Sequence, residues 1–149
     1  MNVIRLEPRL LAGVAALEKE VFATPWSERS LELLCSESAF GFAIMTGDAV
    51  IAYGGMMTVL DEAQITNIAT HPACRRQGLA GSVFRALLDE ARARGIASVT
   101  LEARVSNAAA IALYEKFGFV AVGKRPRFYT QPTEDALIMQ LEMNGQNTL

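Results

Sequence analysis

The sequence predicts an α/β domain in which helices flank one mixed β-sheet. Short apolar runs of strand length alternate with longer segments whose apolar residues recur every three or four positions. The chain has 149 residues, of which 51% are hydrophobic and only 20% charged, so we expect one globular domain over residues 1–149. Residues 144–149 are expected to form a frayed tail.

Several residues predict where these elements begin and end. Gly47 and Asp48 favour a hairpin turn between two strands. Ser27 and Asn107 are good N-caps, and Gly95 should end the longest helix. The expected strands are 3–6, 40–45, 50–59, 64–69, 98–104, 120–123 and 136–142. The expected helices are 10–22, 28–34, 79–94 and 108–117, with a turn at 60–63 and a polar loop at 124–133.

A basic loop that contains glycine leads into the longest helix. It runs from Ile68 to Gly81 and includes Arg75, Arg76 and Gly78. A helix start carries unpaired N–H groups and the positive end of the helix dipole, so the pattern suits a phosphate or pyrophosphate. A glycine before a helix also occurs simply to turn the chain. The loop matches neither the Walker pattern nor Gly-x-Gly-x-x-Gly, so on its own it does not identify a ligand.

Composition argues against several classes of function. A net charge of −2 leaves no basic surface for nucleic acid, and no apolar run reaches the ~20 residues that a membrane span needs. Charged residues near the start do not fit a signal peptide. Cys35 and Cys74 lack metal-ligand spacing, so we expect free thiols in a reducing cytoplasm and no metal site. His71, the single histidine, precedes a proline and is expected to be structural.

Two residues are candidates for chemistry. Glu102 lies in the middle of a strand, where a carboxylate is costly unless it is paired or faces a wet cleft. It is therefore either the partner of Arg104 in a salt bridge or a general base. Tyr114 lies on an apolar helix face, so it is either a core residue or a proton donor whose hydroxyl titrates near ~10.

Two segments together carry a family resemblance. Residues 75–80 read Arg-Arg-Gln-Gly-Leu-Ala, and residues 107–119 read Asn-Ala-Ala-Ala-Ile-Ala-Leu-Tyr-Glu-Lys-Phe-Gly-Phe. The first resembles the pyrophosphate-binding motif of the GCN5-related N-acetyltransferases (GNAT), and the second resembles that family's other hallmark. Both occur in the family's order on a matching strand–helix layout. The chain is therefore identified as a member of this family over nearly its whole length.

The resemblance implies a fold, a co-substrate and catalytic roles. The fold would be a mostly antiparallel sheet that splays between two central parallel strands, at 64–70 and 98–104, with acetyl-CoA in the gap. Glu102 is implied as the base and Tyr114 as the acid, and a bulge N–H near Ile68 would polarise the thioester carbonyl. No metal is implied. Acetyl-CoA would contact Ile68, Ala69, Thr70, Arg75, Arg76, Gln77, Gly78, Leu79, Ala80, Gly81 and Asn107.

Within the family, residues 25–27, 60–63, 67–69 and 101–104 most resemble enzymes that acetylate the N-terminal alanine of ribosomal proteins. This resemblance implies that the acceptor is a protein N-terminal α-amine, with alanine first and a ribosomal protein as carrier. An α-amine also titrates at about 7.7–8.0 and a lysine at about 10.4, so a carboxylate base has the easier task with the former. The residues implied to flank the acceptor are Trp26, Asp61, Glu62 and Tyr129.

Other functions remain open from the sequence. One is an acetyltransferase for a small amine such as a polyamine or an aminoglycoside. The family's Val-Asp and paired tyrosines are Thr70-His71 and Phe128-Tyr129 here, and the latter pair lies where the acceptor would bind. Another is a non-catalytic acyl-CoA-binding module, although the presence of both a candidate base and a candidate acid argues against it. The acidic pair at 61–62 is either an attraction for a basic peptide or a solvated turn.

Overall fold

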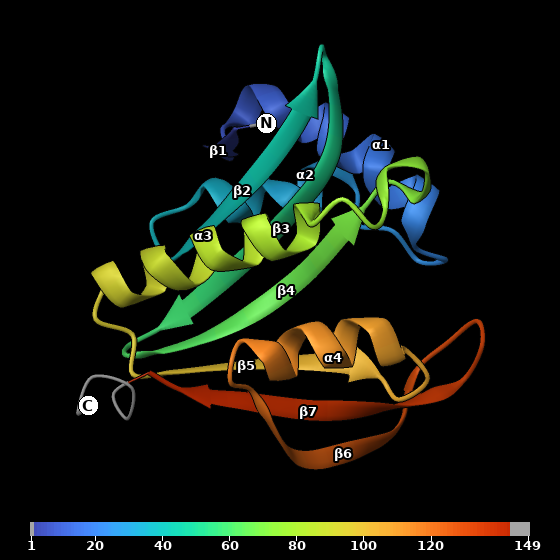
Figure 1. Ribbon diagram of the computed structural model, residues 1–149. Helices are drawn as coiled ribbons and strands as arrows, with labels where there is room; N and C mark the ends of the chain where they lie inside the picture. Colours follow the sequence, from blue (N-terminus) through green and yellow to red (C-terminus); the bar gives the residue numbers. More distant parts are fainter. Residues whose placement is uncertain (1, 144–149) are drawn as a thin grey trace.

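One seven-stranded sheet forms the centre of the protein in this computed structural model, which describes residues 2–143 (Figure 1). The strands lie in the order β1-β2-β3-β4-β5-β7-β6, and all neighbours are antiparallel except β4 and β5. The predicted tail at 144–149 lies outside the described residues. The strands are β1 Val3–Arg5, β2 Ala39–Thr46, β3 Ala49–Val59, β4 Glu62–Thr70, β5 Ser98–Arg104, β6 Val120–Tyr129 and β7 Glu134–Glu142. The helices are α1 Leu11–Val21, α2 Glu28–Leu31, α3 Leu79–Ala93 and α4 Ala108–Lys116, with 3₁₀ turns at Pro8–Leu10, Glu32–Cys35 and Pro72–Cys74.

The parallel strands β4 and β5 separate along their length, which confirms the predicted splay. They pair only through residues 62–64 of β4 and 98–100 of β5. Beyond these residues, β4 continues to Thr70 and β5 to Arg104 without pairing with each other. The two arrows diverge toward their C-terminal ends (Figure 1). The hydrogen-bonding groups of residues 65–70 that face β5 therefore have no strand partner on that side.

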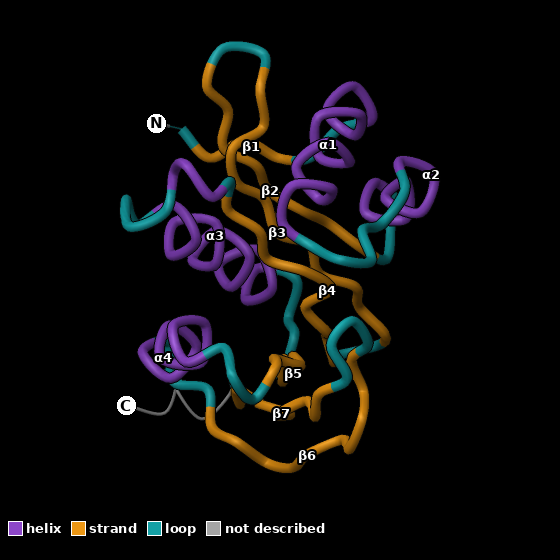
Figure 2. The backbone as a smooth tube through the Cα atoms, turned by 90° about the vertical axis from the view of Figure 1, so that its right-hand side faces the viewer, coloured by secondary structure: helices purple, strands orange, loops and turns teal. Residues whose placement is uncertain are grey.

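Helices cover both faces of the sheet and divide the core into two clusters. α3 and α4 lie on one face, and α1 and α2 lie on the other (Figure 2). The first cluster joins α3 and α4 to the sheet through residues such as Phe84, Leu87 and Met139. The second joins α1 and α2 to the opposite face through residues such as Leu17, Leu31 and Tyr53. The sequence pattern of interleaved strands and helices therefore gives two layers of helices around one sheet.

The longest helix, α3, is held by one apolar face. Its members at helical spacing are all buried, as the sequence predicts: Val83, Phe84, Leu87, Leu88 and Ala91. Truncating Leu87 to alanine is expected to cost about 2–5 kcal/mol. Gly54 of β3 lets this face approach the sheet, because a Cβ built there would lie 2.9 Å from a Val83 methyl group. The glycine pair in this strand marks the predicted close approach.

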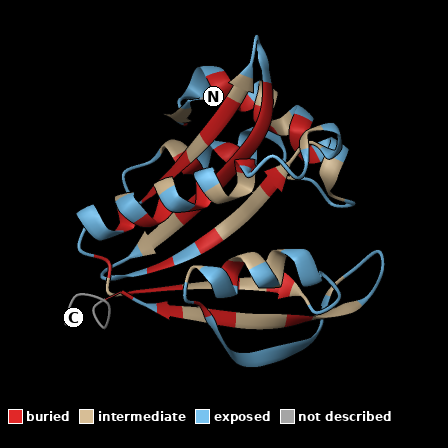
Figure 3. Cartoon of the chain, viewed as in Figure 1, coloured by how far each residue is buried: buried red, intermediate tan, exposed pale blue. Residues whose placement is uncertain are grey.

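One predicted loop is a strand. Residues 124–129 belong to β6, which pairs with β7 through Arg125 and Tyr129, so the loop prediction for 124–133 is wrong over most of its length. β6 lies at one edge of the sheet and is exposed along nearly all of its length (Figure 3). With water on both faces, its residues do not alternate between apolar and polar, and the sequence signal of a strand is lost. β4 also begins at Glu62, inside the turn predicted at 60–63.

Several local predictions are confirmed. The hairpin turn at 47–48 joins β2 to β3. Ser27 caps α2 by accepting the N–H of Ser30, and both cysteines are free thiols. His71 accepts the N–H of Ala73 on Nδ1 at 3.1 Å, which is a structural contact within the turn before α3.

Within residues 2–143, no helix is long and apolar enough to cross a membrane.

Candidate active site

The basic loop before α3 presents backbone groups to solvent. Gly78 has φ +75° and caps α3 without a side-chain hydrogen bond, so the first N–H groups of the helix have no partner within it. A Cβ built at Gly78 would meet nothing within 4 Å, so the space in front of the loop is open. Arg75 and Arg76 are exposed beside it. This geometry fits a phosphate or pyrophosphate.

The C-terminal half of β4 carries a bulge. Thr66 and Asn67 occupy a stretch where β3 has Gly55 alone, and the normal register resumes at Ile68. A bulge re-aims backbone groups and breaks the ladder locally. Together with the unpaired side of β4 that faces β5, it leaves an edge that an extended ligand with amide groups could join as an added strand. The residues implied to bind acetyl-CoA at 68–70 lie at the end of this edge.

The start of α3 lies beside α4, which brings two predicted ligand segments together. A Cβ built at Gly81 would be 3.8 Å from the Leu113 side chain. Asn107 caps α4, as predicted, because its side chain accepts the Ala110 N–H at 3.2 Å. The loop, the open edge of β4 and α4 therefore offer groups that fit the parts of acetyl-CoA. Among residues 2–143, no group of three or more His, Cys, Asp or Glu side chains could hold a metal ion.

Glu102 has partners that the sequence analysis did not identify. Gln64 of β4 donates to its Oε1 at 2.8 Å, and Arg125 of β6 lies 3.4 Å from its Oε2. The side chain is only 12% exposed, and Oε2 makes no hydrogen bond. The predicted alternative, a salt bridge with Arg104, is wrong, because Arg104 pairs with Glu134 at 3.2 Å. A carboxylate with one satisfied and one unsatisfied oxygen is oriented and can still accept a proton.

Tyr114 is buried in the last turn of α4. Its ring stacks on Phe84 with the ring centroids 5.2 Å apart and also lies against Phe119. Burial raises the pKa of Tyr114 to about 12, and the negative charge of an ionised Tyr129 adds to the effect. Tyr114 therefore keeps its proton throughout the neutral range. The burial suits both a core residue and a proton donor, so the two alternatives of the sequence analysis remain.

Tyr129 ends β6 close to the other charged groups. The Arg104 guanidinium lies 4.5 Å from the centroid of its ring. Burial and then the negative charge of Glu102 raise the pKa of Tyr129 to about 12, although Arg104 acts in the opposite direction. Tyr129 therefore lies close enough to both Tyr114 and Glu102 for charge to act between it and each of them.

Two of the remaining residues predicted to flank the acceptor, Trp26 and Glu62, lie on the α1 and α2 side of the sheet. Trp26 follows α1 and packs, half-buried, against the core cluster on that face. Glu62 and Gln64 share this face by strand alternation, and both Asp61 and Glu62 are exposed. Glu62 pairs with Ser98, four residues before Glu102, which is roughly 13 Å along the strand. Asp61 and Glu62 are therefore too far from Glu102 to contact its carboxylate. An extended peptide whose first residue lies at Glu102 could still reach them.

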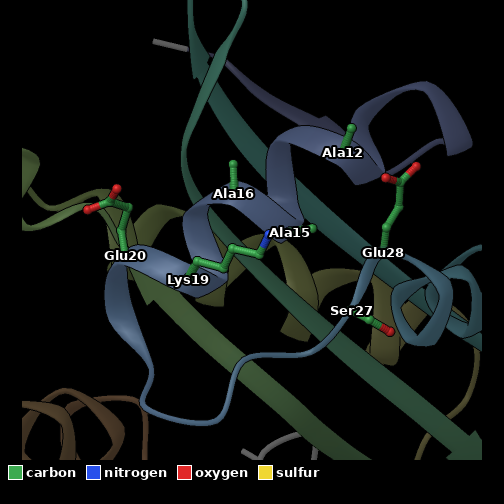
Figure 4. Close-up of a pocket in the computed structure, with 7 residues that line it drawn as sticks. All are labelled: Ala12, Ala15, Ala16, Lys19, Glu20, Ser27 and Glu28. Carbon is green, nitrogen blue, oxygen red and sulfur yellow. The ribbon is translucent and has the colours of Figure 1, made fainter.

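Sequence reasoning missed Gln64 and Arg125. Gln64 could have been found, because it lies on the strand expected beside that of Glu102. Arg125 could not, because its segment was predicted to be a loop. A shallow hollow along α1 and the start of α2 contains none of the predicted site residues (Figure 4). It is lined by Ala12, Ala15, Ala16, Lys19, Glu20, Ser27 and Glu28.

A splayed sheet, a loop whose geometry fits a phosphate, a bulge and an oriented carboxylate are together the features expected of an acyl-CoA-dependent acetyltransferase. Residues 11–119 match the family model described as "Acetyltransferase (GNAT) family". The chain belongs to this family and is an acetyl-CoA-dependent N-acetyltransferase. The fold expected from the family resemblance is confirmed.

Individual relatives are similar over nearly the full length. The ribosomal protein bS18-alanine N-acetyltransferase of Escherichia coli (strain K12) is 40% identical, over 97% of this chain and 99% of that protein. The enzyme with the same name from Haemophilus influenzae is 31% identical, over 83% of this chain and 86% of its own. The crystal structure of the ribosomal-protein-S18-alanine N-acetyltransferase from Escherichia coli superimposes with a TM-score of 0.87 at 38% identity, covering 95% and 93% of the two chains.

Proposed function

We propose that this protein transfers the acetyl group of acetyl-CoA to the N-terminal α-amine of a protein, with alanine preferred as the first residue. The proposed carrier is a ribosomal protein, which makes the cytoplasm the place of the reaction. The names and near-complete coverage of the similar enzymes support this acceptor. The observation that carries the chemistry is the oriented Glu102 carboxylate at the edge of the β4–β5 gap.

The acetyl-CoA site is proposed to use the backbone of β4 and the loop before α3. The open edge at 68–70 would pair with the pantetheine arm, and the N–H groups of 76–81 would hold the pyrophosphate, with Arg75 and Arg76 adding charge. Asn107 would contribute its amide NH₂ group, because its carbonyl oxygen is occupied as a cap. A backbone N–H at the bulge near Ile68 would lie beside the thioester carbonyl and polarise it.

Glu102 is the proposed base. Gln64 fixes one of its oxygens. The other, which lies 3.4 Å from Arg125 and makes no hydrogen bond, would accept the proton of the acceptor amine through a water. Acetyl-CoA supplies the acetyl group as a thioester, which the amine attacks directly. An α-amine, with its pKa of about 7.7–8.0, needs less help from a carboxylate near neutral pH than a lysine does.

Tyr114 is the proposed acid. Its raised pKa of about 12 means that it enters the reaction with its proton in place and can donate it to the departing thiolate. The tyrosine is then reprotonated from water. A role as proton donor requires no positive charge, so a buried aromatic setting is suitable for it.

The acceptor is proposed to lie on the α1 and α2 side of the sheet. Trp26 and Tyr129 would flank its first residue, and Asp61 with Glu62 would attract basic residues further along it. A small amine would not use the distant acidic pair. The second candidate function, acetylation of a polyamine or an aminoglycoside, would depend instead on charges close to Glu102.

Thiol release from acetyl-CoA tests this proposal. The acceptor is a basic peptide that begins with alanine, and the control is the same peptide with its N-terminus blocked and its lysines free. We expect thiol release with the first peptide alone. Release with both would indicate a lysine acceptor, and release with neither would leave a small-molecule enzyme or a non-catalytic acyl-CoA-binding module.

A further inference from the structure

A carboxylate far from the proposed base is completely buried. Glu18 of α1 has no exposed surface, and none of the ion pairs found within residues 2–143 involves it. It accepts three hydrogen bonds instead. The Trp26 N–H donates to Oε1 at 2.8 Å, and the Asn67 amide donates to Oε2 at 2.8 Å. The Tyr53 hydroxyl also donates to Oε2.

The three donors come from three different segments. Trp26 belongs to the 24–27 segment, which is part of the link between α1 and α2. Tyr53 belongs to β3, and Asn67 to the bulge of β4. The Glu18 side chain therefore bonds to both the tryptophan segment and the bulge. Burial and the nearby Glu18 charge also raise the pKa of Tyr53, so its hydroxyl stays a donor.

Burying a carboxylate is costly, and hydrogen bonds alone rarely make it more stable than a well-packed apolar side chain. A buried carboxylate of this kind occurs where the exact placement of the bonded segments matters more than the stability of the fold. The Trp26 contact is made by a backbone N–H, which fixes the path of the chain rather than one rotamer. The bond to Asn67 ties the same carboxylate to the irregular part of β4, next to the residues proposed to meet the thioester.

We propose that Glu18 is a positioning residue that fixes the 24–27 segment against the β4 bulge and thereby aligns the acceptor with the acetyl group. The expected effect on acceptor kinetics rests on the proposed function, because it takes Trp26 to lie beside the acceptor. The role of Glu18 in fixing the 24–27 segment does not depend on the proposed function. Glu18 is expected to touch neither substrate, so its effect reaches the reaction through Trp26 and Asn67.

The test compares chains that differ at Glu18 alone. Tyr53→Phe removes the hydroxyl that would otherwise be left unpaired, so Tyr53→Phe serves as the reference and Glu18→Leu is added to it. Glu18→Gln in the wild-type chain is the conservative variant. Its carbonyl can still accept the Trp26 N–H, while its NH₂ group donates to the Tyr53 oxygen and to a flipped Asn67 amide. Trp26 is the protein's single tryptophan, so its fluorescence reports on this segment directly.

We expect Glu18→Leu to red-shift the emission of Trp26, to lower its anisotropy and to reduce kcat/KM for the alanine peptide by about tenfold or more. The affinity for acetyl-CoA should change by less than about threefold, because Glu18 makes no hydrogen bond to the loop before α3 or to the backbone of 68–70. Tyr53→Phe alone should keep the wild-type emission, and Glu18→Gln should restore most of the rate. An equal red shift of the Trp26 emission in Tyr53→Phe and in Tyr53→Phe with Glu18→Leu would overturn the proposal.

Hydrogen exchange in the wild-type protein tests whether Glu18 holds the 24–27 segment even if the leucine variant does not fold. The Trp26 N–H should exchange slowly, because it is bonded to a carboxylate without exposed surface; exchange as fast as in an open loop would contradict the proposal. Neither exchange nor fluorescence needs an acceptor. If the wild-type enzyme acetylates no N-terminal peptide, the proposed function fails while these two results still decide the role of Glu18.

Discussion

Replacing Gly78 by glutamate should weaken acetyl-CoA binding while the fold is kept. The residue has φ +75°, so any side chain there costs about 1–2 kcal/mol of backbone strain, which lowers Tm by roughly 2–8 °C. The space around it is open, so no steric clash within the protein adds to this cost. A carboxylate about 4 Å from a phosphate charge is repelled by ~1 kcal/mol in water and ~4 kcal/mol near a protein surface. Affinity should therefore fall by about 5-fold to 1,000-fold.

Gly95 provides a matched control at the other end of α3. It has φ +77°, and a Cβ built there also meets nothing within 4 Å. Gly95→Glu therefore introduces the same strain and the same charge away from the proposed phosphate site, with up to ~1 kcal/mol more cost from the helix dipole. Calorimetry with acetyl-CoA should show full binding by Gly95→Glu and weakened binding by Gly78→Glu. Equal affinities for the two folded variants would refute the assignment of the loop.

Three further predictions concern single side chains. Tyr114→Phe should keep acetyl-CoA affinity but lower turnover by ~10²–10⁴-fold, whereas near-normal turnover would make Tyr114 a core residue only. Glu102→Gln should be slow across the neutral range in a pH–rate profile, and a wild-type rate at pH 7 would remove Glu102 from the mechanism. Hydrogen bonds from Arg5 and then Arg94 lower the pKa of Glu90 in the folded protein. Their stabilising effect is fully present above the pKa of an unfolded glutamate, about 4.3, and is lost as the pH falls through the lower folded pKa. In urea unfolding, Glu90→Gln should therefore differ most from wild type near neutral pH, and a difference that persists unchanged in acid would contradict this.

The sequence predicted those elements whose buried positions are apolar and whose ends carry the usual capping residues. α3 has a clear apolar face, and Ser27 and Asn107 are caps with the expected partners. The open edge strand β6 has no such agreement, because water on both faces removes the alternation that marks a strand. The loop prediction for its charged half was wrong for this reason.

The site was predicted less completely than the fold. The hallmarks of the family predict roles for Glu102, Tyr114 and the loop before α3, but they did not reveal which side chains contact Glu102. Arg104 was the nearest cation in sequence to Glu102, yet it lies against Tyr129 and Glu134. The buried Glu18 gave no sequence signal, because a glutamate near the end of an amphipathic helix is normally solvent-exposed.

The most direct test of the central claim is a competition between acceptors for acetyl-CoA. The panel holds peptides that begin with alanine, serine or methionine, an N-blocked peptide with a free lysine, spermidine and an aminoglycoside. The account predicts the highest kcat/KM for the alanine peptide and thiol release near background with the N-blocked peptide. A preference for the blocked lysine peptide, spermidine or the aminoglycoside would contradict the proposed acceptor.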